Sequence, residues 1–476
     1  MRPILFSAAV AQACLVGCAV GPDYREPAPS LPQRWAGAET AAVPTVPPQP
    51  TPAPDPSWWR RFDDPVLDQL VDQALAANTD LRIARARLRA ARAASAQAQG
   101  ALWPTVGAYG SATRTSDAGQ DARSSYGLGF DASWEIDLFG GLRRGSEAAA
   151  ADADASAATL AATHVSLVAE VARNYVLLRG YQRRIEITQA NLDNQSQTLQ
   201  LTEWRAQAGL VGQLDVEQAR ANREQTRAQL PVLLDAATQT RHAIAVLLNQ
   251  PPAALDARLA AGSDPAIPSA SAQPPLGVPA DLLRRRPDIV AAERGLAAAS
   301  ARIGVAEAAL YPSLTLSGTL GLQGAALSAL SGSGAATRLI AASVAAPLFD
   351  AGRLRQQVVI QNAEQEQALA AYEAALTGAL RDVENARAAL ANGRARGVAL
   401  DQATQAARNA ALLANFRYRS GLVDFQTVLD TERTVRTLED SQASTQADTV
   451  IAMIQLYKAL GGGWTAAPAD PSTPTP

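Results

Sequence analysis

The side chains in this sequence that could do chemistry are few, and secondary structure explains most of them. Asp152 and Asp154 have the spacing of a metal-ligating or acid/base pair, but they lie in an Ala-rich stretch that predicts a helix. Asp131, Glu135 and Asp137 occupy every second or fourth position of an alternating stretch, where a strand with one polar face accounts for them. These acids therefore do not indicate a catalytic site.

Histidine and cysteine, the usual residues of nucleophilic catalysis and soft-metal sites, occur only twice each. His164 and His242 are far apart on predicted helices, and both cysteines lie within the first 18 residues. A net charge of -3 and a pI near 5.7 give no general attraction to nucleic acid. We expect no enzyme activity, no metal site, no bound cofactor and no nucleic-acid partner.

The first residues predict a lipid anchor. A basic start followed by an apolar run at 4–16, too short to span a bilayer, predicts a secretory signal peptide at 1–17. The tetrad LVGC, which ends at Cys18, resembles the bacterial lipobox, in which the cysteine carries acyl chains that anchor the protein stably. Ala19 after it is typical of outer-membrane lipoproteins. An ordinary signal peptide with an incidental cysteine is the alternative.

The rest of the sequence is written twice. ALWPTV beginning at Ala101 matches ALYPSL beginning at Ala309, and LFGGLRR at Leu138 matches LFDAGRLR at Leu348. The matched landmarks keep their order at a spacing of about 208 to 212 positions, which indicates tandem duplication of one supersecondary unit.

Each copy predicts one strand hairpin, at 104–138 and at 312–348. Residues 125–138 alternate apolar with polar side chains over more than the ~9 to 11 residues that cross a bilayer, with Tyr126 and Trp134 on the apolar face. A half-buried strand of a soluble sandwich is the alternative. Four strands cannot close a barrel in lipid, so a membrane location requires two or three copies of the chain.

Long helices fill the remainder, which predicts a mainly α fold with a small β part. The helices at 142–208 and 353–420 have lengths of about 100 Å at ~1.5 Å per residue, and Gly209 and Gly421 are placed to end them in left-handed caps. Helices of this length and composition favour a coiled-coil-like bundle or cylinder.

The predicted organisation is, in chain order: signal peptide 1–17, lipid-anchored extended segment and belt 18–77, first repeat 78–250 with helices 142–208 and 213–249, belt linker 251–285, second repeat 286–461 with helices 353–420 and 425–460, and a disordered tail 462–476.

Four stretches carry a family resemblance: GCAVGPDYREP from Gly17, WWRRFDDPVLDQLVDQALAANTDL from Trp58, DLLRRRPDI from Asp281 and QLYKALGGGW from Gln455. On these, the chain resembles the TolC-like outer-membrane efflux factors of the lipoprotein subgroup. The resemblance implies a homotrimer, anchored in the outer membrane of a Gram-negative bacterium. Its twelve strands would form a barrel, and its helices would continue the barrel into the periplasm. It also implies a passive exit duct for drugs or other small molecules, working with a periplasmic adaptor and an inner-membrane pump.

The resemblance also implies roles for the helix tips. Tyr418 and Asp430, with Arg419 and Asp424 in the same tip, match family positions that close the periplasmic aperture; Thr427 replaces an acid that some relatives carry. The surface that receives the adaptor is formed by Gly209, Leu210, Val211, Gly212, Gly421, Leu422 and Val423. The plainer alternatives are a solvated helix residue for Asp430 and helix capping alone for the glycines.

Two other functions compete with drug efflux. A type I protein secretion conduit uses the same fold. A periplasmic coiled-coil lipoprotein with a structural or adaptor role shares the anchor and the helices, but gives no reason for four alternating strands.

Overall fold

The computed structural model describes residues 19–28, 57–116, 121–260, 266–269 and 286–462. It has two compact units: the first contains Met1–Pro29, Arg85–Thr159 and Asp288–Ala375, and the second contains Ser30–Ala84, Leu160–Pro287 and Leu376–Pro476. The predictions for the signal peptide, for Cys18 and for the tail after residue 462 lie outside the described residues, as does most of the linker at 251–285.

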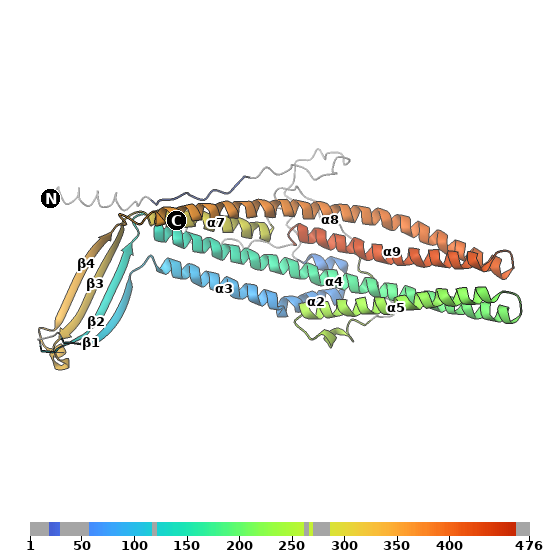
Figure 1. Ribbon diagram of the computed structural model, residues 1–476, viewed down its shortest axis with the longest axis horizontal. Coiled ribbons are helices and arrows are strands. Elements are labelled where there is room, and N and C mark those ends of the chain that lie inside the picture. The colour runs from blue at the N-terminus through green and yellow to red at the C-terminus, as the bar shows by residue number, and fades with distance from the viewer. Residues whose placement is uncertain (1–18, 29–56, 117–120, 261–265, 270–285, 463–476) are drawn as a thin grey trace. The chain divides into compact units, whose positions relative to one another are not determined.

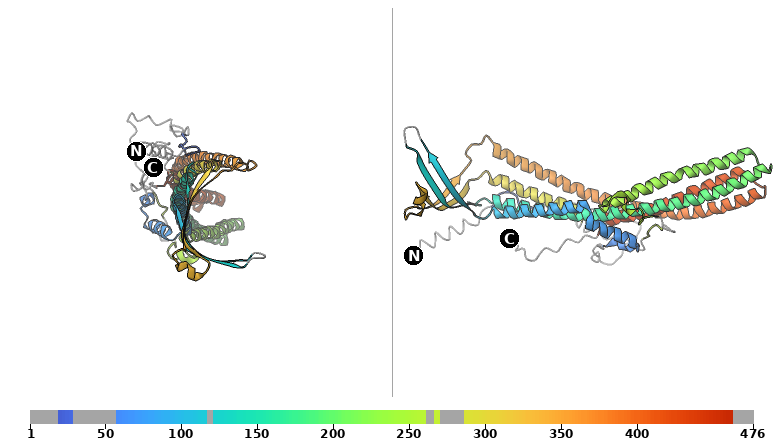
Figure 2. Two further views of the ribbon diagram at one scale, coloured as in Figure 1. Left: turned by 90° about the vertical axis from the view of Figure 1, so that its left-hand side faces the viewer. Right: turned by 90° about the horizontal axis from the view of Figure 1, so that it is seen from below.

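The first unit contains one antiparallel sheet, shown in Figure 1. Its strands are β1 (Thr105–Thr115), β2 (Arg123–Ile136), β3 (Ser313–Gly324) and β4 (Ala336–Ala345), in the order β1-β2-β3-β4. The hairpins β1–β2 and β3–β4 come from the two copies, and the pairing of β2 with β3 joins them. Figure 2 shows the curvature of the sheet. Within the described part of the chain, strands β1 and β4 each pair on one side only.

One face of the sheet exposes large apolar side chains. On β2, Leu128 is 57% exposed and Phe130 is 60% exposed, and they lie opposite Leu322 and Leu320 of β3. A soluble sandwich would bury these residues, whereas a membrane barrel directs them to lipid. At the end of β2, the indole N–H of Trp134 donates to the backbone carbonyl of Leu102 at 3.0 Å.

The helices repeat in length and position. Helices α4 (Gly141–Gln207) and α8 (Arg353–Arg419) each have 67 residues, α5 (Gln213–Leu247) and α9 (Phe425–Ala459) have 35, and α3 (Thr79–Gly100) and α7 (Pro287–Ala308) have 22. The bounds of α8 lie 212 positions after those of α4, from 141 to 353 and from 207 to 419. The structure confirms a mainly α fold with a small sheet, built from a duplicated unit.

The second unit packs shorter elements near the ends of α5 and α9. Turn η2 (Trp58–Phe62) buries Trp58, whose ring stacks on Tyr457 of α9 with centroids 5.0 Å apart. Helix α2 (Pro65–Ala77) follows, and η3 (Pro252–Leu255) comes after α5. The side chain of Asn78 donates to the carbonyl of Leu247 at 2.9 Å, which joins the start of α3 to the end of α5. The start of α3 therefore lies against the end of α5.

Candidate functional site: the helix tips

Both helical hairpins turn through the same backbone motif. Gly209 and Gly421 each have φ of +72°, a conformation that disfavours other residues, and open space surrounds both positions. The amide of Leu210 donates to the carbonyl of Arg205 at 2.8 Å, and the amide of Leu422 donates to Arg417 at 2.9 Å. This is a Schellman-type cap, so the two glycines are required by the turn.

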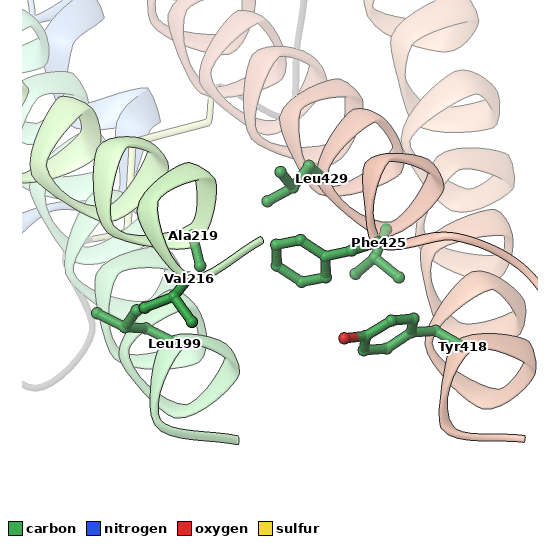
Figure 3. Packing of buried hydrophobic residues seen from close by; sticks show 7 residues of the cluster. Leu199, Val216, Ala219, Tyr418, Phe425 and Leu429 are labelled. Carbon is green, nitrogen blue, oxygen red and sulfur yellow. The ribbon is translucent and has the colours of Figure 1, made fainter. Parts of the chain in front are cut away.

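The two tips share one apolar cluster, which Figure 3 shows at close range. Tyr418 and Phe425 point from α8 and α9 toward Leu199 and Val216 of α4 and α5, with the ring centroids of Tyr418 and Phe425 5.3 Å apart. The buried members are Leu199, Val216, Ala219, Tyr418, Phe425, Val428 and Leu429. The cluster holds the first-copy hairpin against the second-copy hairpin.

Tyr418 is the polar member of this cluster. It is 5% exposed, and the guanidinium of Arg205 lies 4.5 Å from the centre of its ring, as in a cation–π contact. Arg205 also donates to the backbone carbonyl of Tyr418 at 3.3 Å. Burial raises the pKa of the Tyr418 hydroxyl, although the nearby charge of Arg205 opposes the shift. Tyr418 thus links α8 to α4 in its neutral form.

The predicted acidic residues of the second tip lie outside the cluster. The side chain of Asp430 is 59% exposed; its carboxylate lies 3.6 Å from Arg433 and accepts from Gln426 at 2.9 Å. Asp424 caps α9, because it accepts from the backbone amide of Thr427 at 2.9 Å. Hydrogen bonds from the hydroxyl and amide of Thr427 lower the pKa of Asp424. No contact in the described part of the chain joins Tyr418 to Asp430, so a shared role in a gate stays a prediction.

The predicted adaptor surface projects apolar side chains at the turns. Leu210 is 68% exposed and Leu422 is 73% exposed, whereas Val423 is partly buried against the apolar cluster. Arg419, Gly212 and Gly421 are exposed, and Val211 is partly buried. An apolar residue at the apex of each hairpin is available to a partner.

Sequence reasoning missed two contributors to the tip. Phe425 lies at the start of α9, and Arg205 lies four residues before Gly209 of the first-copy apex. Neither stands out in sequence: an aromatic residue and an arginine on long helices are ordinary. The contacts join residues more than 200 positions apart, and only folding shows which of these positions meet.

A second site of close packing involves residues 19–24 in the first unit. The amide of Val20 donates to the carbonyl of Phe139 at 3.1 Å, just after β2 ends. Asp23 forms an ion pair with the largely buried Arg144 of α4 at 2.5 Å, and hydrogen bonding from Arg144 lowers the pKa of Asp23. The hydroxyl of Tyr24 donates to Glu293 of α7 at 3.0 Å.

Glycines permit this approach. Gly21 has φ of +92°, and a Cβ at that position would collide with the backbone of Gly304 on α7. A Cβ on Gly304 would lie 2.8 Å from the side chain of Arg144. The chain that follows Cys18 is therefore held against α4 and α7 close to the end of β2.

Among the acids whose spacing is typical of a catalytic pair, Asp152 has a structural partner, because it forms an ion pair with Arg302 of α7. Among the described residues, no three His, Cys, Asp or Glu side chains gather in the way a metal ion would need.

Paired long helices with capped tips, joined to an open sheet with an exposed apolar face, define a channel protein that combines a helical barrel with outer-membrane strands. Comparison with known proteins agrees. The family model for outer membrane efflux proteins matches residues 70–250 and 278–462. The chain belongs to this family.

Individual relatives are similar over nearly their whole length. The pyoverdine export outer membrane protein OpmQ of Pseudomonas putida is 37% identical over 87% of this chain and 89% of its own. The solvent efflux pump outer membrane protein SrpC of Pseudomonas putida is 32% identical, with 95% and 96% covered. The solved structure of the outer-membrane channel OprN is 40% identical with a TM-score of 0.86, over 94% of this chain and 100% of that chain. The chain is an outer-membrane exit duct of an efflux pump.

Proposed function

We propose that three copies of the chain form a passive duct for small molecules, which serves a periplasmic adaptor and an inner-membrane pump. The observation that carries the proposal is a four-stranded sheet with an exposed apolar face and two uncovered edges. Unpaired backbone groups are not tolerated in lipid, so β1 of one copy must pair with β4 of another. Three copies supply twelve strands. The relatives named for pyoverdine, solvent, toluene and antibiotic export support small molecules as the cargo.

The trimer is tested by native mass spectrometry of the purified chain and by conductance in planar bilayers. We expect a trimeric mass and discrete channel openings. Leu128→Arg places a charge on the apolar face and should cost about 2–4 kcal/mol at mid-membrane, so the inserted trimer is lost. Asp131→Arg is the matched control on the opposite face, and it should leave the trimer intact. A water-soluble monomer in the absence of detergent would contradict the proposal.

Lipid attachment at Cys18 is part of the same proposal. The contacts of residues 19–24 with α4 and α7 support it, because they fix the start of the mature chain near the end of β2. Acyl chains on Cys18 would then enter the membrane that the strands span. Intact mass spectrometry of the wild type and of Cys18→Ala tests this: we expect the acyl mass only in the wild type. Equal masses, apart from the substitution, would rule out the anchor.

We also propose that the second-copy tip closes the aperture. In a trimer, exposed Asp430 would form a threefold ring, since its first-copy counterpart is Gln218. A ring of carboxylates at close range attracts cations, and so makes the aperture selective for them. Tyr418 would contribute indirectly, because its contact with Arg205 holds α8 against α4. Asp424 would set the start of α9, and Arg419 would add a charge beside the opening.

The gate is tested by single-channel conductance of Asp430→Ala combined with Tyr418→Leu, which removes the ring that Arg205 contacts. We expect larger conductance and increased antibiotic leakage into cells at normal expression. Unchanged conductance would show that neither residue closes the aperture, and it would not contradict the trimer.

The adaptor surface is the apex of both hairpins. Leu210 and Leu422 offer exposed apolar side chains on a rigid turn, which suits the helical hairpin of a partner. Photo-crosslinkers at these two positions should capture the adaptor in cells. A crosslinker at exposed Trp204, six residues before Leu210, is the control and should capture less.

A further inference from the structure

A large cavity lies among α4, α8 and α9 in the second unit, behind the helix tips. Its volume is about 1020 Å³, near the upper end of the range for small-molecule sites, roughly 300–1,000 Å³. Amides and hydroxyls of α4 line one wall, and Leu412, Phe416 and Val435 contribute an apolar wall from α8 and α9. Leu412 is 57% exposed and Phe416 is 58% exposed, so the apolar wall is open to an incoming molecule.

Two acceptor oxygens at this cavity have no hydrogen-bond partner in the described part of the chain. One is Oε1 of Gln195, a residue only 5% exposed, and the other is Oε2 of Glu432. The second carboxylate oxygen of Glu432 accepts a long bond, 3.4 Å, from the hydroxyl of Thr198. Buried acceptors without donors are costly, and each such group in a folded protein calls for an explanation.

No cation neutralises Glu432 in the described part of the chain, although cations line the same cavity. Arg408 forms an ion pair with the neighbouring carboxylate Glu439 at 2.7 Å, and Arg205 contacts the ring and carbonyl of Tyr418. The third arginine at the cavity, Arg419, is exposed to solvent. Burial raises the pKa of Glu432, although hydrogen bonding from Asn415 and Thr198 opposes the shift. The site thus combines a carboxylate, a buried amide oxygen and an open apolar wall.

We propose that this cavity binds a small organic cation that carries a protonated amine on an apolar body. The ammonium group would donate to Glu432 and to Gln195 once these side chains turn toward the cavity, and the apolar body would lie against Leu412 and Phe416. The site goes beyond the duct function, because it lies between helices of one chain and its occupancy needs neither adaptor nor pump. Its occupant would bridge α4 to α8 and α9 close to the apolar cluster of the tips.

The probe for this site is 1-naphthylmethylammonium, which has one amine, one aromatic body and its own fluorescence. Binding is measured by equilibrium dialysis against the purified full-length trimer in detergent, with empty micelles subtracted. Glu432→Gln keeps the shape and the bond to Thr198 but removes the charge. We expect it to weaken binding about tenfold or more, the ratio for one charge-assisted hydrogen bond.

Two controls make the result specific. Glu439→Gln alters the other carboxylate at the cavity, which Arg408 already occupies, and should change the affinity by less than about threefold. The neutral isostere 1-naphthylmethanol should bind the wild type about tenfold more weakly than the ammonium. Trimer mass is checked for each variant, so that a failure of assembly is not mistaken for a failure of the site.

Equal affinity of wild type and Glu432→Gln, or equal binding of alcohol and ammonium, would overturn the proposal and leave the duct function unaffected. Failure of the ammonium to bind, together with capture of a protein by a photo-crosslinker at Leu412, would also overturn it and show a protein docking groove instead.

Discussion

The α4–α5 tip and the α8–α9 tip share one backbone turn but differ in the side chains behind it. Gly209 and Gly421 have the same φ and the same flanking hydrogen bonds. Behind the turn, the second copy places Tyr418 and Phe425, whereas the positions 212 residues earlier hold Ala206 and Gln213. Both copies therefore keep the same turn, but only the second copy has the aromatic pair that packs between the tips. We therefore expect the packing of the second tip to determine the stability of both tips.

Among the tests of this difference, Phe425→Ala should have the largest effect. Removing a ring that is 3% exposed should cost about 3–5 kcal/mol of local stability. Hydrogen exchange of peptides from both tips, measured on the assembled protein, should show faster exchange in α8–α9 and in the facing α4–α5 tip. The control is Gln213→Ala at the matching exposed position, which should change little, within about 0.5 kcal/mol. Similar effects of the two variants would mean that the tips are equivalent.

For the backbone turn that both tips share, we expect matching substitutions in the two copies to have equal effects. Gly209→Ala and Gly421→Ala each force a side chain into the left-handed region, at a cost of about 1–2 kcal/mol, although neither meets a steric clash. Exchange at the two apices should rise by the same factor. A much larger effect at Gly421 would show that the turns differ in strain as well as in packing.

A smaller effect is expected where one copy reaches into the other. Arg205 belongs to the first copy but lies over the ring of Tyr418, and such a contact contributes about 0.5–2 kcal/mol. Arg205→Gln should therefore loosen the α8–α9 tip. Arg417→Gln, at the corresponding second-copy position, should not loosen α4–α5, because Arg417 is exposed. Exchange of peptides on each side distinguishes these outcomes, and loosening of both tips by Arg417→Gln would contradict the one-way link.

Much of this architecture follows from pattern alone. Strict alternation predicts a strand at 125–138, and β2 spans Arg123–Ile136. The place of Gly209 and Gly421 after unbroken helical runs predicts left-handed caps, and both residues have positive φ. Periodicity and turn chemistry are local, so a sequence displays them directly. Because the unit is repeated, each pattern in the first copy also predicts the matching element of the second copy.

The tip interior could not be read in the same way. Tyr418 and Asp430 were assigned to one gate by resemblance, but the fold buries the first among apolar residues and leaves the second exposed. Glu432, two residues further along α9, lies at a cavity that no spacing rule marks. Which helix faces meet depends on the relative rotation of α4, α8 and α9, and sequence period fixes that rotation only to within a broad stripe.

The finest difference between the tips is the first residue of the returning helix. Asp424 caps α9 with its carboxylate, whereas its counterpart Gly212 provides no side-chain cap for α5. The bonds from Thr427 lower the pKa of Asp424 in the folded chain, so its stabilising contribution is present above the ordinary aspartate pKa of about 3.9. That contribution is lost as the pH falls through the lowered value. As the pH falls below the ordinary aspartate value of about 3.9, the start of α9 should therefore lose protection from exchange relative to the start of α5, once the intrinsic pH dependence is removed. Asp424→Asn, which keeps an acceptor but no titrating charge, should abolish the difference; its persistence in that variant would assign the pH dependence to another group at the tip.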